Sequence, residues 1–267
     1  MRRIFGYTVL ALIFFVLISV WTLKIDNSLG YSEFVSGGAL FFIISFLFLF
    51  NIRKRLPFLP LWPAHKWFLL HTIMGFLALL LFWLHAGSLW PKGLYVQILA
   101  SLFYLTTLSG IVGLIMEKIY PNLLTRIGHE CIYERIPHDI AKIRKKSEKL
   151  ILECTEKTGS DTLAKHYLET LGWFFQRPRF FINNIFGGRD SYNWVNQQCA
   201  ILERFLNEAE REYMKQIFTL AEIKIKIDHH YSLQTMLKNW LLIHIPLAAA
   251  AMVMAVWHLI VIQVYFN

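Results

Sequence analysis

The stretch WFLLHTIMGFLALLLFWLHAGSLWP, residues 67–91, decides the fold, because it contains no Asp, Glu, Lys or Arg. About 20 apolar residues in an α-helix are enough to cross the roughly 30 Å hydrocarbon core of a bilayer. Residues 67–91 are therefore predicted to form a transmembrane helix. Its two histidines, His71 and His85, lie fourteen residues apart, and a polar group at membrane depth is usually functional.

The rest of the composition agrees with a membrane protein. Of the 267 residues 56% are hydrophobic and only 17% are charged, whereas soluble domains have about 25% charged residues. Four more stretches lack charges over a spanning length: residues 4–23, 34–52, 93–116 and 239–267. We therefore predict an all-α, polytopic bundle of five transmembrane helices. Residues 1–116 hold the first four helices, residues 117–238 form a helical cytoplasmic insert, and residues 239–267 complete the bundle.

Basic residues orient this bundle. Loops on one side hold Arg2, Arg3, Arg53, Lys54, Arg55 and Lys66, whereas the loops opposite hold only Lys24 and Lys92 as basic residues. The rule that Lys and Arg stay inside places the N-terminus and the insert in the cytoplasm and the C-terminus outside, as in a bacterial inner membrane. The net charge of +9 then reflects topology and contact with anionic lipid, so nucleic-acid binding is not expected. The third and fifth helices run parallel.

Four histidines form two pairs with equal spacing. His71 and His85 lie on the third helix, and His244 and His258 lie on the fifth. Fourteen residues of α-helix return to within about 40° of the starting face and rise about 21 Å. Parallel helices would pair His71 with His244 near the inner face. They would pair His85 with His258 near the outer face.

Neutral imidazole is a common haem-iron ligand, so the two pairs predict two b-type haems at different depths. Structural hydrogen bonding across helices or proton relay are the alternative roles for these histidines. Small residues and one Phe lie on the same stripes: Gly75, Ala78, Phe82, Ala248, Ala251 and Ala255. They leave room for a flat macrocycle, or they allow close helix packing. Haem propionates need cationic or hydrogen-bonding partners, and Lys66, with Arg53 and Arg55, is expected to serve the inner haem and Lys92 the outer one. The alternative is that these basic residues only set the topology.

The insert is predicted to be helical and without a catalytic domain. We expect helices over residues 139–157 and 161–175, a turn at Tyr120-Pro121, and a long helix from Asp190 or Ser191 to about residue 227 that leads almost directly into the fifth span. An apolar run at residues 180–182 is suited to the membrane surface. Glycine-rich nucleotide motifs are absent from the sequence, and the three cysteines lack Cys-x-x-Cys spacing. An electron donor would have to be a quinol or another subunit.

The histidine layout resembles the membrane domains of ferric reductases and NADPH oxidases. Those domains carry two His pairs, thirteen or fourteen residues apart, on their third and fifth helices, and His71, His85, His244 and His258 match this layout. The resemblance covers about residues 67–265. The sequence differs in lacking a sixth helix and the flavin- and nicotinamide-binding domain, and in a much larger loop before the fifth helix. The resemblance implies the haem scaffold of a stand-alone di-haem cytochrome b that works with partner subunits.

These observations lead to three functional hypotheses. The first is a di-haem cytochrome b subunit that carries electrons across the membrane between a quinone pool or partner subunit and an acceptor on the other side. Expected partners are membrane lipid, quinone and redox subunits such as multihaem cytochromes, iron-sulfur proteins or flavoproteins. The second is a transmembrane metal or cytochrome reductase. The third is a haem-free membrane scaffold that recruits partners through its cytoplasmic helices.

Overall fold

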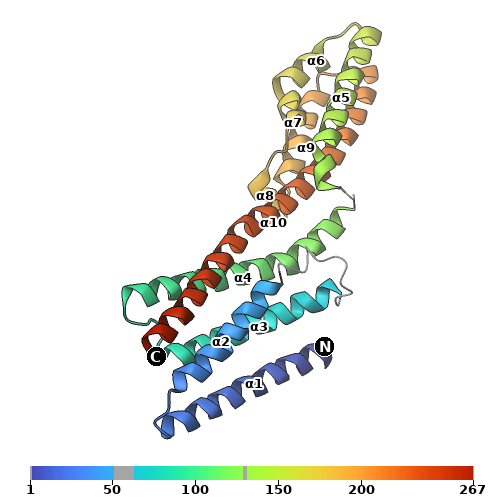
Figure 1. Cartoon of the computed structure of the whole chain (residues 1–267). Helices are drawn as coiled ribbons and strands as arrows, with labels where there is room; N and C mark the ends of the chain where they lie inside the picture. The colour runs from blue at the N-terminus through green and yellow to red at the C-terminus, as the bar shows by residue number, and fades with distance from the viewer. Residues whose placement is uncertain (1, 51–62, 129–130, 267) are drawn as a thin grey trace. The chain divides into compact units, whose positions relative to one another are not determined.

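The computed structural model describes residues 2–50, 63–128 and 131–266, which form helices joined by short loops and contain no β-strand (Figure 1). The predicted all-α class is confirmed. Five of these helices are long and apolar enough to cross a membrane: α1 (Arg2–Asn27), α2 (Ser32–Leu49), α3 (Ala64–Ala86), α4 (Leu94–Ile127) and α10 (Glu208–Phe266).

The apolar windows of these five helices keep most of their side chains on the outside. No more than 28% of the residues in any window are buried within the protein. Leu17, Leu108 and Leu242 are examples, each more than half exposed. Because exposed apolar side chains at this density are unfavourable in water, lipid is their expected surrounding. The chain is an integral membrane protein.

The structure corrects two predictions for the transmembrane region. The third span was expected to reach residue 91, but α3 ends at Ala86, because Gly87 adopts a left-handed conformation with φ of 62° and caps the helix. Tyr120-Pro121 was expected to be a turn, but α4 continues through Pro121 to Ile127. A proline inside a helix removes one backbone hydrogen bond, and here the helix continues despite that loss.

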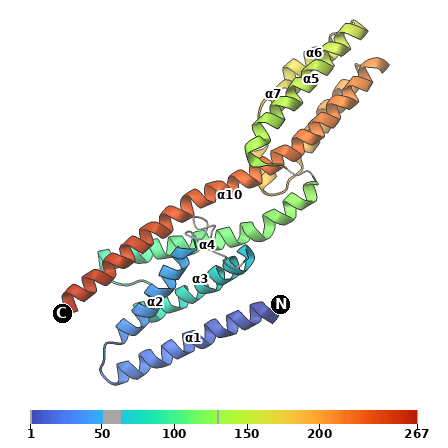
Figure 2. The same cartoon turned by 45° about the vertical axis from the view of Figure 1, so that its right-hand side comes forward.

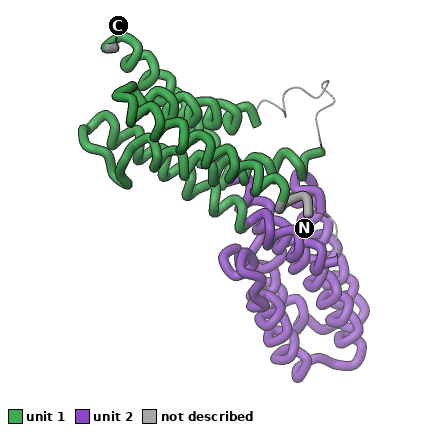
Figure 3. The backbone as a smooth tube through the Cα atoms, turned by 90° about the horizontal axis from the view of Figure 1, so that it is seen from below, with its two compact units in different colours: residues 1–115, 240–267 green, residues 116–239 purple. Residues whose placement is uncertain are grey.

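The chain separates into two compact units (Figure 3). Unit 1 contains Met1–Ile115 and Trp240–Asn267, and unit 2 contains Met116–Asn239. In unit 1, α1, α2 and α3 pack on one another. Their shared core includes Leu40, Ile43, Leu77 and Leu81, and Leu81 is fully buried.

In unit 2, helix α5 (Ile136–Thr158) runs beside the first part of α10 (Figure 2). The other elements are a 3-10 turn (Tyr133–Arg135), α6 (Thr162–His166), a π-helical stretch (Tyr167–Leu171), α7 (Gly172–Gln176), α8 (Phe181–Ile185) and α9 (Asp190–Glu203). The core is mainly aliphatic, with Phe174 and Phe175 fully buried within it. Unit 2 thus has its own apolar core.

The predicted long helix of residues 190–227 is two helices. The helical structure is interrupted between Glu203, the last residue of α9, and Glu208, the first of α10. Asn207 caps the start of α10. The Glu210 N–H donates to Asn207 Oδ1 at 2.8 Å, and the Asn207 N–H donates to Glu210 Oε2 at 2.9 Å. This reciprocal pair is a capping box with Asn in place of Ser or Thr, and it begins a new helix. From there α10 continues without interruption to Phe266, so the expected direct connection to the fifth span is confirmed.

Candidate functional site

Unit 1 contains an apolar cavity of about 830 Å³ among α2, α3, α4 and α10. Cavities of about 300–1,000 Å³ are typical of sites for small molecules and cofactors. All four predicted ligands line it: His71 and His85 from α3, and His244 and His258 from α10. Two residue pairs far apart in the sequence therefore meet at one site.

The two rings of the outer predicted pair lie close together. The imidazole centroids of His85 and His258 lie 6.4 Å apart, and the ring planes are inclined at 80°. Imidazole nitrogens bind transition metals at about 2 Å, so a metal between two imidazoles would hold their centroids about 6 Å apart. The observed centroid separation is close to this value.

His85 is held from the side by α2. Ser36 Oγ lies 3.2 Å from His85 Nδ1, and Ser36 is almost fully buried. When Nδ1–H donates to this hydroxyl, Nε2 keeps the lone pair that binds a metal. The next residue, Gly37, lies so close that a Cβ there would be 2.8 Å from His85 Cε1. The serine therefore orients the ring, and the glycine leaves space for it.

His244 has an equivalent neighbour on α4. Ser109 Oγ lies 3.3 Å from His244 Nδ1. Trp240 stacks on the imidazole with centroids 5.1 Å apart, and its indole N–H donates to the Ser109 carbonyl at 2.8 Å. A Cβ at Gly113 would overlap the Trp240 ring, so only glycine allows the indole to lie there.

The other histidine of each pair has an unsatisfied nitrogen. Within the described residues, Nδ1 of His71 and Nδ1 of His258 are buried and have no hydrogen-bond partner. His258 stacks on Tyr95 with centroids 6.0 Å apart, and the Tyr95 hydroxyl is buried and likewise unpaired in the described part of the chain. Buried unpaired polar atoms are costly, and they often mark a place where a bound ligand or water belongs.

The small residues on the predicted stripes also line the cavity. Gly75, Ala78, Ala248, Ala251 and Ala255 all contribute to its wall. A Cβ at Gly75 would meet no described atom within 4 Å, so open space adjoins this position. Phe82 also lines the cavity and stacks on Phe103 with centroids 4.5 Å apart, so the ring packs between α3 and α4.

The predicted propionate partners lie elsewhere. Lys66 is half-buried in the first turn of α3, and Lys92 is exposed in the loop between α3 and α4. Neither lysine lines the cavity, and their role stays a prediction. Arg53 and Arg55 lie outside the described residues.

Sequence reasoning missed the residues that support the histidines: Ser36, Tyr95, Ser109 and Trp240. These side chains matter only because α2 and α4 lie beside the histidines, which no periodicity in the sequence indicates. A useful signal would have been a hydroxyl residue next to or near glycine within a span, as in Ser36-Gly37 and Ser109-Gly110.

No protein-family model, curated protein or solved structure matches this chain. The resemblance to ferric reductases and NADPH oxidases therefore stays a prediction from the four histidines. What the structure defines is a class: a polytopic helical membrane protein with a histidine-lined cavity among its spans.

Proposed function

We propose that this protein binds two b-type haems and carries electrons across the membrane as a subunit of an oxidoreductase complex. His71 and His244 would hold one haem, and His85 and His258 the other. The observation that carries the proposal is the meeting of all four histidines at one apolar cavity, with the rings of the outer pair 6.4 Å apart.

The protein's part would be to hold, orient and dehydrate the redox groups. Bound haem would supply one-electron redox chemistry, and axial imidazoles and an apolar surrounding set its potential. Ser36 and Ser109 would fix the rings of His85 and His244 so that Nε2 faces the cavity. The aliphatic and aromatic lining from α2 and α4 would keep water away.

The electron donor and acceptor would lie on opposite sides of the membrane. We infer a quinone pool or a redox subunit as the partner, because the sequence lacks a nucleotide or flavin motif. Candidate subunits are multihaem cytochromes, iron-sulfur proteins and flavoproteins. The excess of basic residues on one side favours a cytoplasmic N-terminus and insert, with the C-terminus in the periplasm of a bacterial inner membrane.

The direct test is the haem content of the purified chain. We expect two haems per chain and a b-type reduced-minus-oxidised spectrum. His85→Ala and His258→Ala should each remove one haem, and it should be the same haem, whereas His138→Ala on the exposed face of α5 should remove none. A folded chain without haem would contradict the proposal and favour the haem-free scaffold. Retention of both haems in every variant would contradict the ligand assignment.

A further inference from the structure

Helix α8 of unit 2 turns two large apolar side chains outward. Ile182 is 73% exposed and Phe186, just after the helix, is 83% exposed. In the preceding helix Phe174 and Phe175 are fully buried, whereas Trp173 is 44% exposed, less than Ile182 or Phe186. We call the α8 surface the set of the side chains of Ile182 and Phe186 and the two exposed arginines that flank them, Arg177 and Arg189.

This surface lies at the end of unit 2 from which the chain continues into the spans. Asn184 of α8 donates to Ser232 Oγ at 3.4 Å, and Ser232 precedes the apolar span at residue 239 by seven residues. Seven residues of helix rise about 10 Å. A Cβ at Gly187 would lie 3.4 Å from Leu123 Cδ2, and Leu123 follows the apolar part of α4 by seven residues. Both contacts therefore join α8 to helix residues that lie seven positions along the chain from an apolar span.

The charge of this segment suits an anionic surface. Residues 172–189 contain three arginines and no acidic residue. Arg179 stacks over Trp173, with Cζ 3.9 Å from the ring centroid, whereas Arg177 and Arg189 are exposed. Basic side chains near a membrane surface gain about 1 kcal/mol each from anionic lipid.

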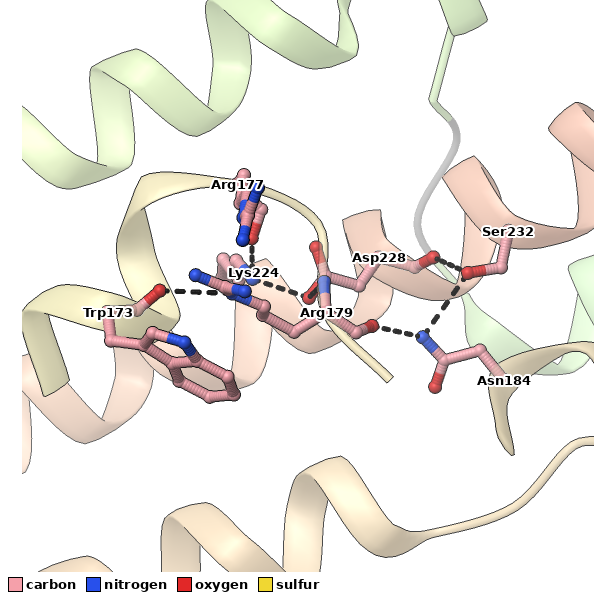
Figure 4. Close-up of polar contacts among 7 residues, drawn as sticks. All are labelled: Trp173, Arg177, Arg179, Asn184, Lys224, Asp228 and Ser232. Atoms are coloured by element: carbon pink, nitrogen blue, oxygen red, sulfur yellow. Dashed lines mark hydrogen bonds and ion pairs between the residues drawn. The ribbon is translucent and has the colours of Figure 1, made fainter. Parts of the chain in front are cut away.

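A buried polar stripe on α10 fixes the segment in place. Lys224, Asp228 and Ser232 lie one turn apart on α10, and all three are fully buried (Figure 4). Lys224 Nζ donates to Asp228 Oδ2 at 2.5 Å and to the Arg177 carbonyl at 2.9 Å. The Arg179 N–H donates to Asp228 Oδ2 at 3.2 Å.

The stripe also reaches α8. Asn184 Nδ2 donates to the Arg179 carbonyl at 3.0 Å as well as to Ser232, as Figure 4 shows. Phe180, between the loop and α8, has a positive φ of 56°, which is unfavourable for a residue with a side chain. Burying a charged pair is costly, and here the contacts of that pair determine the position of the loop before α8. These hydrogen bonds attach the loop before α8, and α8 itself, to α10.

We propose that the α8 surface is an anchor that inserts Ile182 and Phe186 into the lipid headgroup region, with Arg177 and Arg189 beside anionic phosphates. The lipid leaflet is the one on the side of the insert. Exposed apolar residues of this kind, with basic neighbours, are the usual composition of interfacial anchors. The anchor would fix the insert at the membrane whether or not the cavity of unit 1 holds haem.

The test places an environment-sensitive fluorescent amino acid at position 186 of the full-length protein, with one chain per lipid nanodisc. The matched control has the same amino acid at position 205, because Phe205 is 71% exposed and precedes α10, which rises about 45 Å before residue 239. We expect doxyl-labelled lipid to quench position 186 at least twofold more than position 205. Aqueous iodide should show the reverse order.

Arginine substitutions separate the charge contribution from the apolar one. In nanodiscs with phosphatidylglycerol, R177Q/R189Q should lower lipid quenching at position 186 about twofold, and in pure phosphatidylcholine it should change little. Equal iodide quenching at positions 186 and 205 would overturn the proposal. The proposal would also be overturned if position 186 is protected from iodide only when chains associate in detergent. That result would show that a second copy of the chain, and not lipid, covers the α8 surface. If the reporter at position 186 prevents folding, position 182 provides the same comparison.

Discussion

Gly37 offers the sharpest test of the outer histidine pair. In Gly37→Ala the new methyl would lie 2.8 Å from His85 Cε1 and 3.1 Å from Nδ1. Ordinary Cβ contacts begin near 3.4 Å, so the imidazole would have to recede by about 0.6 Å. The ring has little freedom to do so without losing its 3.2 Å contact to Ser36 or its alignment with His258.

The expected result is selective loss of one haem from a folded protein. Disturbing the orientation of a metal ligand typically costs 10–100-fold in affinity, or about 1.4–2.7 kcal/mol. Alanine favours a helix over glycine by about 1 kcal/mol, so α2 itself should not be weakened by its new residue. Overpacking adds a further cost of about 1–3 kcal/mol at the contact with His85.

The assay is haem content and potentiometric titration after purification. Gly6→Ala is the matched control, because Gly6 is an exposed helical glycine where a Cβ would meet no described atom within 4 Å. We expect Gly37→Ala to lose the haem that His85→Ala loses, and Gly6→Ala to keep both. Two haems with unchanged potentials in Gly37→Ala would refute the reasoning.

Three other substitutions test the remaining contacts. Ser109→Ala should lower haem affinity at the inner pair alone, again 10–100-fold, as measured by haem titration of the apoprotein; equal loss at both pairs would contradict this. Lys224→Met should destabilise unit 2 by about 3–5 kcal/mol in denaturant unfolding, because Asp228 stays buried without its cationic partner. Lys224→Met with Asp228→Leu should recover part of the loss, since no charge of the buried pair then remains but the Arg179 N–H and the Arg177 carbonyl lose their bonds. Lys238→Ala should change the free energy of unfolding by less than about 1 kcal/mol, because the side chains of Lys238 and its partner Glu134 are 50% and 71% exposed. A loss near 3 kcal/mol would contradict this expectation.

The spans were predictable because the signal is local. A charge-free stretch of about 20 residues has few alternatives to a membrane helix, and fourteen-residue spacing on a helix fixes the relative position of His71 and His85 from geometry alone. Helix ends were less predictable. Pro121 was misinterpreted because one lost hydrogen bond does not stop a long helix, whereas Gly87 stops α3 through its left-handed backbone.

The supporting side chains could not be predicted, because they depend on which helices are neighbours. Ser36 and Ser109 become partners of His85 and His244 only once α2 and α4 pack beside α3 and α10. In contrast, the capping residues Asn207 and Glu210 were readable from the sequence as an Asn-x-x-Glu pattern. This pattern indicates a helix start at Asn207 and therefore two helices within residues 190–227.

The two serine hydroxyls that contact the paired histidines come from different helices, Ser36 from α2 and Ser109 from α4. A substitution at one of these positions leaves the neighbour of the other imidazole intact. If the cavity holds the two proposed haems, a change at one serine would therefore alter the electron affinity of one haem while the other stays constant. Under the proposed function, the difference in potential between the two haems, and with it the preferred direction of electron transfer, would then respond to single substitutions far from either ligand in the sequence.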